Sequence, residues 1–360
     1  MFFPDPLPET LVLGGAAWEA VALAMQALGR ADLATRKIPN PGLLRRPSLR
    51  REAQSTSALE GTHAVLSEVL EADAGGRAMT PEIREVLNYA EMAEAAIEAV
   101  ATRPITFGQL CEWQAMLVRG TSSDGPESGK VRDSQVVIGP KHCLVEEARF
   151  VPPPPGDLLV TALREWVDWV ERARSMPVAV QAALAHYQFE TLHPFHDGNG
   201  RIGRLVIVLQ LIRKGDLRDG LLTISPWLEA RRDEYQGALL RLSQTGDWDH
   251  WVTFFSRALT AASEATVERI ERLLAFQAYV RDLVHTRKPP IRGTAIRIAE
   301  DLIGNPVITV KSTARRYDVT YQAANNAISR LVGAEILVEA TGRSYDRIFF
   351  APQVIRILEL

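Results

Sequence analysis

The chain has 360 residues, of which 46% are hydrophobic and 24% charged, and its formal net charge is −3 at pH 7. This composition is typical of a folded globular protein with an ample core, and it excludes a long disordered chain. The nearly neutral charge creates no overall field that would favour nucleic acid or a membrane surface as the partner.

The cysteines and the N-terminal segment indicate the cellular compartment in which the protein is expected. Cys111 and Cys143 have no metal-type spacing and are too few for a disulfide scaffold, so they indicate a reducing compartment. Residues 1–6 lack the charged and apolar regions of a signal peptide, and no uncharged apolar run approaches about 18 residues. We therefore expect a cytoplasmic protein without a membrane span.

The first half of the chain is predicted to be mostly helical. Residues 11–28, 92–100 and 107–118 repeat apolar side chains at helical spacing, which predicts three helices. A short β-rich run at 134–138 is bounded by turn residues and predicts a strand. Residues 144–151 are its expected partner, so a hairpin should stand before the proline run that follows.

The second half continues as helix and then changes its pattern. Helical spacing extends from residue 158 to about 283, with breaks at prolines, and residues 287–290 predict a linker. Beyond the linker we expect helices near 296–302, 312–317 and 321–333, followed by strands at 336–340 and 346–350. This order of helices and hairpin is that of a winged helix.

Residues 193–204 hold more reactive side chains than any other stretch of the chain. They lie between two apolar segments, 178–192 and 205–212, that predict buried helices. Gly198 and Gly200 have no Cβ atoms, so the backbone N–H groups can surround an anion where the second helix begins. The stretch therefore has the backbone of a phosphate-binding loop.

The side chains of the same stretch support this interpretation. Arg201 and Arg204 are three residues apart and can present guanidinium groups to phosphate oxygens. Asp197 offers a carboxylate for a Mg²⁺ ion that bridges phosphates, and His193 is suited to act as general base toward a hydroxyl group. The sequence thus predicts a nucleotide-phosphate site with a base beside it.

A dinucleotide-binding loop is the alternative interpretation of the glycines. Residues 198–203 match G-x-G-x-x-G, but that fingerprint should follow a strand, and here it follows a predicted helix. We therefore disfavour a dinucleotide-binding fold.

Residues 193–204 match the motif H-x-F-x-[D/E]-G-N-G-R-x-x-R at every fixed position, and over about residues 5–260 the chain resembles the Fic family. The resemblance implies a protein adenylyltransferase in which His193 deprotonates the target hydroxyl and Asp197 holds Mg²⁺ or Mn²⁺ on the phosphates of ATP. The residues implied to bind the phosphate chain are Gly198, Asn199, Gly200, Arg201 and Arg204.

Two further features are implied for this family's cleft. The predicted hairpin resembles the family's flap, whose exposed edge would pair with an extended target segment. The flap residues are Ser134, Gln135, Val136, Val137, Ile138 and Gly139. Relatives often carry a second aromatic residue after the position of Tyr235, where this chain has Gln236, so the base preference stays open.

An upstream segment resembles the family's inhibitory motif, [S/T]-x-x-x-E-[G/N]. Thr56 and Glu60 are four residues apart and lie on one face of a predicted helix, and Gly61 is placed to end that helix. The resemblance implies that Glu60 pairs with Arg204 and occupies the γ-phosphate region. ATP would then bind in a pose that prevents in-line attack.

The expected fold is mainly α: a Fic-type helical core with a small β-hairpin flap and a C-terminal winged-helix domain. The expected domains are residues 1–105, a helical region carrying the inhibitory helix; residues 106–275, the catalytic core; and residues 276–360, the winged helix. A homodimer through the core or the winged helix is a further expectation.

The function expected from the resemblance is transfer of AMP from ATP to a serine, threonine or tyrosine hydroxyl of another protein or of the chain itself. Other outputs remain open: transfer of phosphocholine, UMP or phosphate, or removal of AMP from a modified protein. A nucleotide-sensing DNA-binding regulator is the alternative from another class. From residue 290 onward, however, nine basic residues face seven acidic ones, a weak excess for a DNA-binding domain.

Overall fold

The chain folds mainly as α-helices with one small sheet, as the sequence predicts. The computed structural model describes residues 1–38, 40–139, 144–288, 290–340 and 347–360. The helices before the long final one of the core are α1 (Gly15–Arg36), α2 (Pro41–Leu59), α3 (Leu66–Asp73), α4 (Pro81–Val100), α5 (Phe107–Val118), α6 (Asp157–Arg172), α7 (Val178–Leu192), α8 (Asn199–Lys214), α9 (Ser225–Glu229) and α10 (Arg232–Thr245).

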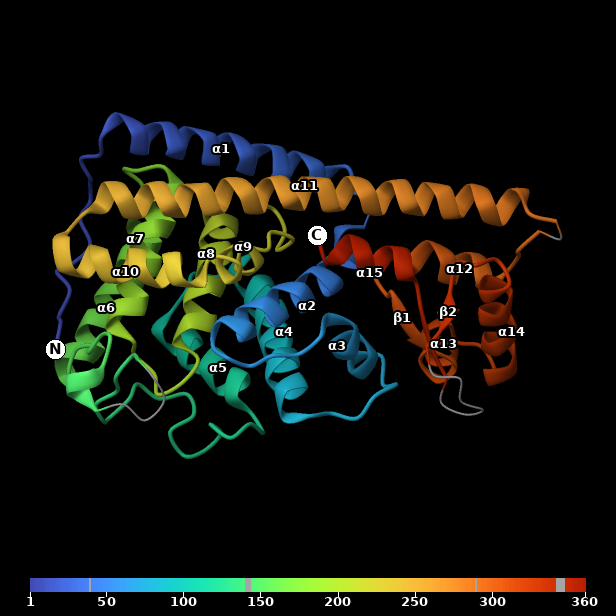
Figure 1. Ribbon diagram of the computed structural model, residues 1–360, viewed down its shortest axis with the longest axis horizontal. Helices are drawn as coiled ribbons and strands as arrows, with labels where there is room; N and C mark the ends of the chain where they lie inside the picture. The colour runs from blue at the N-terminus through green and yellow to red at the C-terminus, as the bar shows by residue number, and fades with distance from the viewer. Residues whose placement is uncertain (39, 140–143, 289, 341–346) are drawn as a thin grey trace.

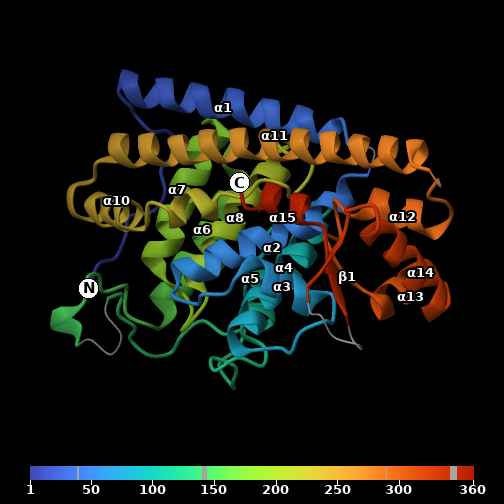
Figure 2. The ribbon, with the colours of Figure 1, turned by 45° about the vertical axis from the view of Figure 1, so that its right-hand side comes forward.

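Helix α11 (Trp248–Thr286) runs the length of the molecule, and α1 lies against it (Figures 1 and 2). The two helices are parallel, because Gly14 N donates to Asp249 Oδ1 at 2.6 Å near their starts and Arg30 pairs with Glu264 at 3.0 Å farther along. Despite its length, α11 is not apolar enough to cross a membrane, and neither is any other helix within the described residues.

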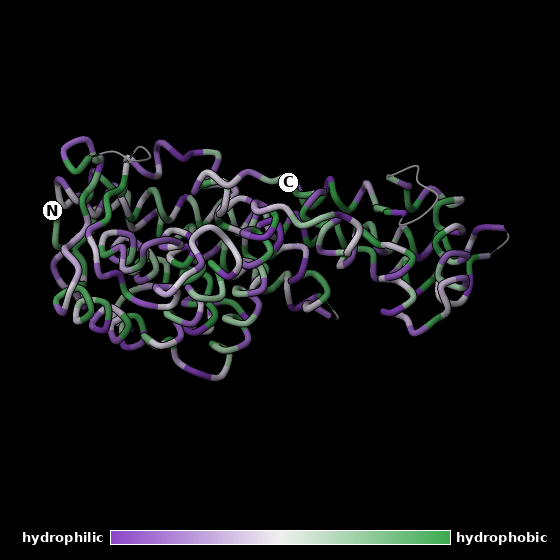
Figure 3. The backbone as a smooth tube through the Cα atoms, turned by 90° about the horizontal axis from the view of Figure 1, so that it is seen from below, coloured by the Kyte–Doolittle hydropathy of each residue, from purple (hydrophilic) through white to green (hydrophobic). Residues whose placement is uncertain are grey.

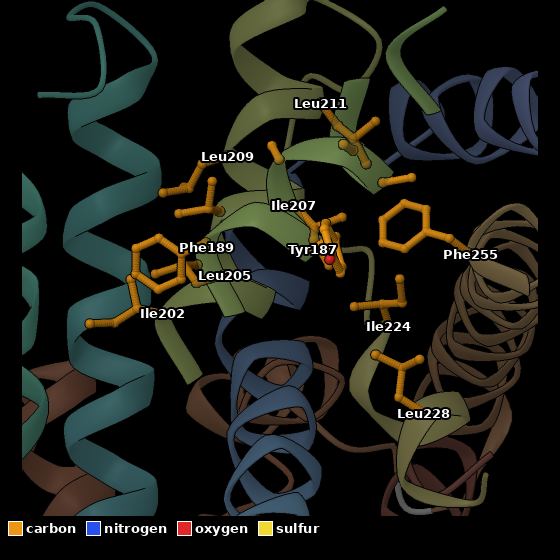
Figure 4. Packing of buried hydrophobic residues seen from close by; sticks show 14 of the residues in the cluster. Tyr187, Phe189, Ile202, Leu205, Ile207, Leu209, Leu211, Ile224, Leu228 and Phe255 are labelled. Carbon is orange, nitrogen blue, oxygen red and sulfur yellow. The ribbon is translucent and has the colours of Figure 1, made fainter. Parts of the chain in front are cut away.

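Helices α7 and α8 form the centre of the larger hydrophobic core (Figure 4). Nearly every residue of both helices is buried, which agrees with their almost continuous apolar sequences. Tyr187 and Phe189 of α7 and Leu205 of α8 contribute to this packing together with Phe255 of α11. The loop that joins the two helices is therefore held between two buried elements.

A second, smaller hydrophobic core lies at the other end of α11. It joins residues of α11 such as Leu273 to Leu44 of α2, Leu70 of α3 and Ile298 of the C-terminal region. Hydrophobic and hydrophilic segments alternate along the tube at both ends of the molecule (Figure 3). Helices α2 and α11 each supply side chains to both cores, so they connect the two ends of the molecule.

The C-terminal region contains the expected helices and strands, and two elements that the sequence analysis missed. Its elements are α12 (Thr294–Asp301), β1 (Val307–Thr309), α13 (Val310–Tyr317), α14 (Tyr321–Val332), β2 (Val338–Glu339), β3 (Ile348–Phe350) and α15 (Pro352–Leu358). The strands form an antiparallel sheet in the order β1-β3-β2, with Val307 opposite Phe350. β1 and α15 were not predicted, and part of the segment between β2 and β3, residues 341–346, lies outside the described residues.

The strand predicted at residues 134–138 is wrong, and the flap is not a regular hairpin. Its only described β-pairing is a single antiparallel bridge, in which Ile138 and Phe150 exchange backbone hydrogen bonds of 2.9 and 3.0 Å. On the partner side a 3₁₀ turn, Val145–Glu147, replaces strand structure. Pairing at one position leaves the remaining backbone groups without a ladder, so β-propensity alone did not make a strand there.

Candidate active site

The loop between α7 and α8 depends on two residues with left-handed backbone conformation. His193 ends α7 with φ +48° and ψ +60°, and Gly198 precedes α8 with φ +88°. A Cβ atom at Gly198 would also come within 2.6 Å of Leu117 Cδ2. Gly198 is therefore required both for its conformation and for the close approach of α5.

Asn199 holds the loop together through both ends of its side chain. Its Oδ1 accepts from Phe195 N at 2.8 Å, and its Nδ2 donates to Phe195 O at 2.7 Å, in a buried position. Each end of the Asn199 side chain is thus engaged within the loop, and binding of the phosphate chain by Asn199 stays a prediction from the family resemblance.

Asp197 lies at the start of α8 with its carboxylate partly exposed. Its Oδ1 accepts from Gly198 N at 2.7 Å and from Arg201 Nη2 at 2.8 Å. Desolvation opposes ionisation, but the charge of Arg201 and the hydrogen bonds to the carboxylate lower the pKa of Asp197 below its usual value. Asp197 is therefore an ionised carboxylate beside the phosphate loop.

A magnesium ion fits this chemistry. Mg²⁺ in nucleotide sites takes one or two carboxylates and completes its shell with phosphate oxygens and water. Asp197 supplies one such carboxylate, and within the described residues no cluster of three or more metal-ligating side chains exists that would form an all-protein site.

Arg201 is buried and already neutralised by acidic side chains. It contacts Asp197 at 2.8 Å and Glu85 of α4 at 3.4 Å. Glu85 was not singled out from the sequence, because it lies more than a hundred residues upstream on a different helix. Any anion that approaches Arg201 must share it with these two carboxylates.

Arg204 is almost fully buried and is held by the C-terminal end of α2. Its Nε donates to Thr56 Oγ1 at 2.7 Å, its Nη2 donates to Thr56 O at 3.1 Å, and Nη2 lies 2.5 Å from Glu60 Oε1. Gly61 follows with φ +92°, a conformation that ends the helix. The structure thus brings together Thr56, Glu60 and Arg204, which are far apart in the sequence.

Glu60 also comes very close to the backbone of α8. A Cβ atom at Gly200 would overlap both the Glu60 carboxylate and the Arg204 guanidinium. Desolvation raises the pKa of Glu60, but the positive charges of Arg204 and Arg201 outweigh it, so its pKa lies below the usual value. Glu60 is therefore an anion seated at the N-terminal turn of α8, where an unpaired helix end favours negative charge.

The imidazole of His193 faces the same cleft in its neutral form. Desolvation lowers the pKa of His193 to about 4, although the nearby Glu60 charge acts in the opposite direction. Its Nδ1 lies 3.3 Å from Glu190 O. A neutral ring at physiological pH can accept a proton, which is what a general base requires.

Residues of the loop and of α2 line one cleft together with residues of the flap and of α10. Glu60, His193 and Arg204 are among its charged and polar residues. Its apolar lining residues include Ile138, Phe150, Leu239 and Leu240. A lining that combines charged and apolar side chains suits a ligand with phosphates and a flat base.

Of the flap residues 134–139, Ile138 lines this cleft. Ser134 O accepts from Arg132 Nη1 at 3.2 Å, and the Gln135 amide donates to Val136 O and Pro152 O. Val137 and Gly139 flank the bridged Ile138, and the structure records no ladder partner for the exposed side of this segment among the described residues. Residues 140–143, the predicted turn, lie outside the described residues.

Sequence reasoning missed a buried group of side chains behind Arg204. Tyr235 hydroxyl lies 2.7 Å from His186 Nε2, and Glu190 Oε1 is buried 4.0 Å from the same nitrogen without a hydrogen-bond partner. Desolvation raises the pKa of Glu190 to about 7 and lowers the pKa of His186 to about 3. His186 and Glu190 lie four residues apart on α7, and this spacing was the available signal in the sequence. The same spacing is common in helices.

Arg132 is a second residue that the sequence did not single out. It is buried, and its guanidinium donates to four backbone carbonyls, His193 O at 2.8 Å, Pro153 O at 2.5 Å, Ser134 O at 3.2 Å and Leu192 O at 3.5 Å. It therefore ties the flap to the loop that carries His193.

Two models of one family match about half of the chain. Residues 18–98 match the Fic/DOC family N-terminal model, and residues 104–211 match the Fic/DOC family model. A Fic family protein from Desulfovibrio desulfuricans has a similar fold, with a TM-score of 0.61 and 23% identity over 96% of this chain and 98% of that one. Residues 134–508 of Fic-1 from C. elegans are also similar, with a TM-score of 0.53 and 20% identity over 72% of this chain and 73% of that one.

The curated relatives are named as adenylyltransferases. Protein adenylyltransferase fic-1 of Caenorhabditis briggsae is 28% identical over 183 residues, which are 50% of this chain and 32% of that protein. A probable protein adenylyltransferase of Aquifex aeolicus is 28% identical over 145 residues, 39% of this chain and 42% of that protein. The chain thus matches less than half the length of these relatives.

Proposed function

This chain belongs to the Fic/DOC family, and from that membership and the geometry of its cleft we propose that it transfers AMP from ATP to a hydroxyl group of a protein. The observation that carries the proposal is one cleft lined by a neutral His193, the N-terminal turn of α8 and the buried Arg204. Relatives named as protein adenylyltransferases support the same activity.

The reaction needs positioning and charge neutralisation more than covalent help. His193 accepts the proton of the target hydroxyl, the hydroxyl oxygen attacks the α-phosphorus of ATP, and the bond to the bridging oxygen of pyrophosphate breaks. The N–H group of Gly200 and the side chains of Arg201 and Arg204 stabilise the negative charge on the phosphates, and the N–H group of Gly198 joins them when it leaves the Asp197 carboxylate.

Asp197 would hold a magnesium ion on the α- and β-phosphates. When bound, the ion neutralises charge on the phosphates and on the departing pyrophosphate. Manganese has the same preference for oxygen ligands and would serve as well. The ion pair between Asp197 and Arg201 supports this role, because it fixes one carboxylate oxygen and leaves the other for a metal.

Glu60 acts as the inhibitor of this site. Its carboxylate takes the Arg204 guanidinium and the anion position at the first turn of α8, so the γ-phosphate of ATP cannot occupy them. A misplaced triphosphate turns its α-phosphorus away from in-line attack, and misalignment of this kind reduces rates by about a hundredfold.

The flap would receive the target. An extended segment can add backbone hydrogen bonds to residues 134–139, whose pairing is limited to Ile138 in the described part of the chain. The chain's own exposed hydroxyls are candidate targets. The division into domains at residues 105 and 275, the winged-helix assignment, DNA binding, the homodimer and the cytoplasmic location stay predictions from the sequence.

Intact-mass spectrometry after incubation with ATP and Mg²⁺ tests both catalysis and inhibition. We expect the Glu60→Gly protein to gain the mass of AMP at a rate at least tenfold above that of the unaltered chain, because Arg204 becomes free to bind the γ-phosphate. The Glu60→Gly, His193→Ala double variant should gain nothing, because the general base is lost.

The same incubation with an extended panel of cellular proteins and labelled ATP covers targets other than the chain itself. Equal rates for the unaltered and Glu60→Gly proteins would reject inhibition by Glu60. Labelling that persists without His193 would reject the proposed base.

A further inference from the structure

A second cleft lies away from the catalytic one, where α2 and α3 meet the C-terminal region. Its volume is about 270 Å³, and its walls include Arg46 of α2, Asp73 of α3, and Asn305, Ser312, Arg315 and Arg316 of the C-terminal region. Figure 1 shows α3 beside β1 and α13, at the junction between the larger core and the C-terminal region. Nothing in the proposed reaction uses these residues.

The cleft has an excess of positive charge. Asp73 is the acidic side chain in its wall, and it is paired with both Arg46 at 2.9 Å and Arg50 at 3.0 Å. Arg315 and Arg316 are exposed on α13, and neither has a hydrogen bond, ion pair or ring contact with any described residue. Two unpaired guanidinium groups and a third that shares its carboxylate therefore line one cleft.

This arrangement suits a small phosphorylated ligand. Guanidinium groups bind phosphate oxygens in pairs, and the neutral side chains of Asn305 and Ser312 can add hydrogen bonds. Residues of α2, α3 and α13 line the space together, so it is a cleft between elements rather than an open face for a duplex.

The wall formed by α2 is continuous with the inhibitory end of the same helix. Arg46 and Pro47 line the cleft, and Glu60 stands at the C-terminus of α2 in the catalytic site. Pro47 has no N–H, so it cannot donate to Leu43 O within the helix. Gly304 of the C-terminal region packs against that carbonyl and the Leu43 side chain so closely that a Cβ would overlap both.

Gly304 of the C-terminal region thus contacts α2 at Leu43 O, a carbonyl that receives no helical hydrogen bond from Pro47. Leu44 belongs to the smaller core, whereas Leu49 and Ala53, farther along α2, belong to the larger one. An anion that draws Arg46 away from Asp73 therefore acts directly on the contact between α2 and the C-terminal region.

From these contacts we infer that the junction cleft binds a small phosphorylated ligand and that its binding loosens the hold of α2, and with it Glu60, on the catalytic site. Binding of the ligand does not depend on the proposed transferase activity. That a loosened Glu60 raises the rate of AMP transfer rests on the proposed function. The structure assigns the recognition to Arg315 and Arg316 and the transmission to α2.

Calorimetric titration with inorganic phosphate and with ribose 5-phosphate tests the binding in the full chain. The Arg315→Ala, Arg316→Ala double variant should lower affinity at least tenfold. Arg330→Ala is the matched control, because Arg330 is an exposed arginine on α14 that does not line the cleft, and it should bind as the unaltered chain does. Hydrogen exchange of residues 50–61, with and without ribose 5-phosphate, measures the effect on α2 without any need for activity.

Faster exchange of residues 50–61 on ligand addition, lost in the double variant, would support the inference. Equal affinities of the double variant and the unaltered chain would overturn the site. Binding without any change in exchange would overturn the link to α2. Binding of a duplex DNA, lost in the double variant while neither phosphate compound binds, would replace the small ligand by nucleic acid.

Discussion

His193 is a residue whose surroundings change its chemistry. In water its imidazole would be half-protonated near pH 6.5, but desolvation in the cleft lowers its pKa to about 4. Glu60 raises this pKa slightly through its charge, so the Glu60→Gly protein should have an even lower value. The base is therefore ready throughout the neutral and mildly acidic range.

The pH dependence of kcat/KM for the Glu60→Gly protein tests this, since it reports the free enzyme. We expect a plateau from neutral pH down to about pH 5 and a fall with a midpoint at or below about pH 4. A midpoint close to 6.5 would mean that His193 is solvated like an exposed histidine, contrary to its place in the cleft.

Burial raises the pKa of Glu190, whereas it lowers the pKa of His186 and of His193. Between pH 4.5 and 6.5 the unfolded chain protonates His186 and His193 but not Glu190, whereas the folded chain protonates Glu190 alone. The unfolded chain then binds one proton more, so these groups make stability rise with pH by about 1.4 kcal/mol per unit.

Glu190→Gln removes the opposing carboxyl, so these groups give a difference of two protons and the slope becomes steeper than that of the unaltered chain. Urea unfolding at several pH values between 4.5 and 6.5 measures it, with the exposed Glu19→Gln as the control that keeps the original slope. Parallel slopes for Glu190→Gln and the unaltered chain would show that Glu190 is ionised in the folded state.

At the scale of elements, α2 joins regulation to architecture. Its C-terminal end supplies Thr56 and Glu60 to Arg204, while its N-terminal part packs against the C-terminal region through Leu43 and Gly304. A small change at the far end of the helix should therefore reach the catalytic cleft.

Gly304→Ala tests this connection. The added Cβ overlaps Leu43, so we expect a loss of about 1–3 kcal/mol in stability, as for other overpacked sites, and faster self-modification with ATP because Glu60 is held less firmly. Gly237→Ala is the matched control: that glycine is exposed on α10 with no atom near its Cβ position, so stability should stay equal or rise by up to about 1 kcal/mol.

Thermal melting and the intact-mass assay measure the two effects in the same preparations. If Gly304→Ala lowers stability but leaves the rate of self-modification as it was, α2 does not transmit strain to Glu60.

At the scale of the whole molecule, the two hydrophobic cores are not independent. Leu259 and Leu273 of the single helix α11 belong to different cores, and Leu49 and Leu44 of α2 divide in the same way. Unfolding of one core would remove packing from α11 and α2, which also supply side chains to the other core.

We therefore expect one cooperative transition by scanning calorimetry, with equal calorimetric and van't Hoff enthalpies. Two resolved transitions would indicate that the C-terminal region unfolds separately, and they would weaken the predicted transmission through α2 as well.

Local patterns determined much of this protein. The phosphate loop follows from the sequence because its glycines, Asp197, Arg201 and Arg204 lie within twelve consecutive residues between two apolar helices, and α5 begins and ends where helical spacing predicts. Spacing of three or four residues on a helix sets which side chains share a face, so such neighbours need no tertiary information. The pairing of Glu60 with Arg204 was expected only from the family resemblance.

The tertiary structure decided what depends on contacts between distant segments. It pairs the Asn199 side chain with the backbone of Phe195, buries Glu190 Oε1 without a hydrogen-bond partner, and limits the pairing of the flap to a bridge at Ile138 within the described residues. It also divides α2 between two cores. Burial, which sets the pKa values of Glu190 and His193, is produced by packing between helices far apart in the chain, and no local spacing encodes it.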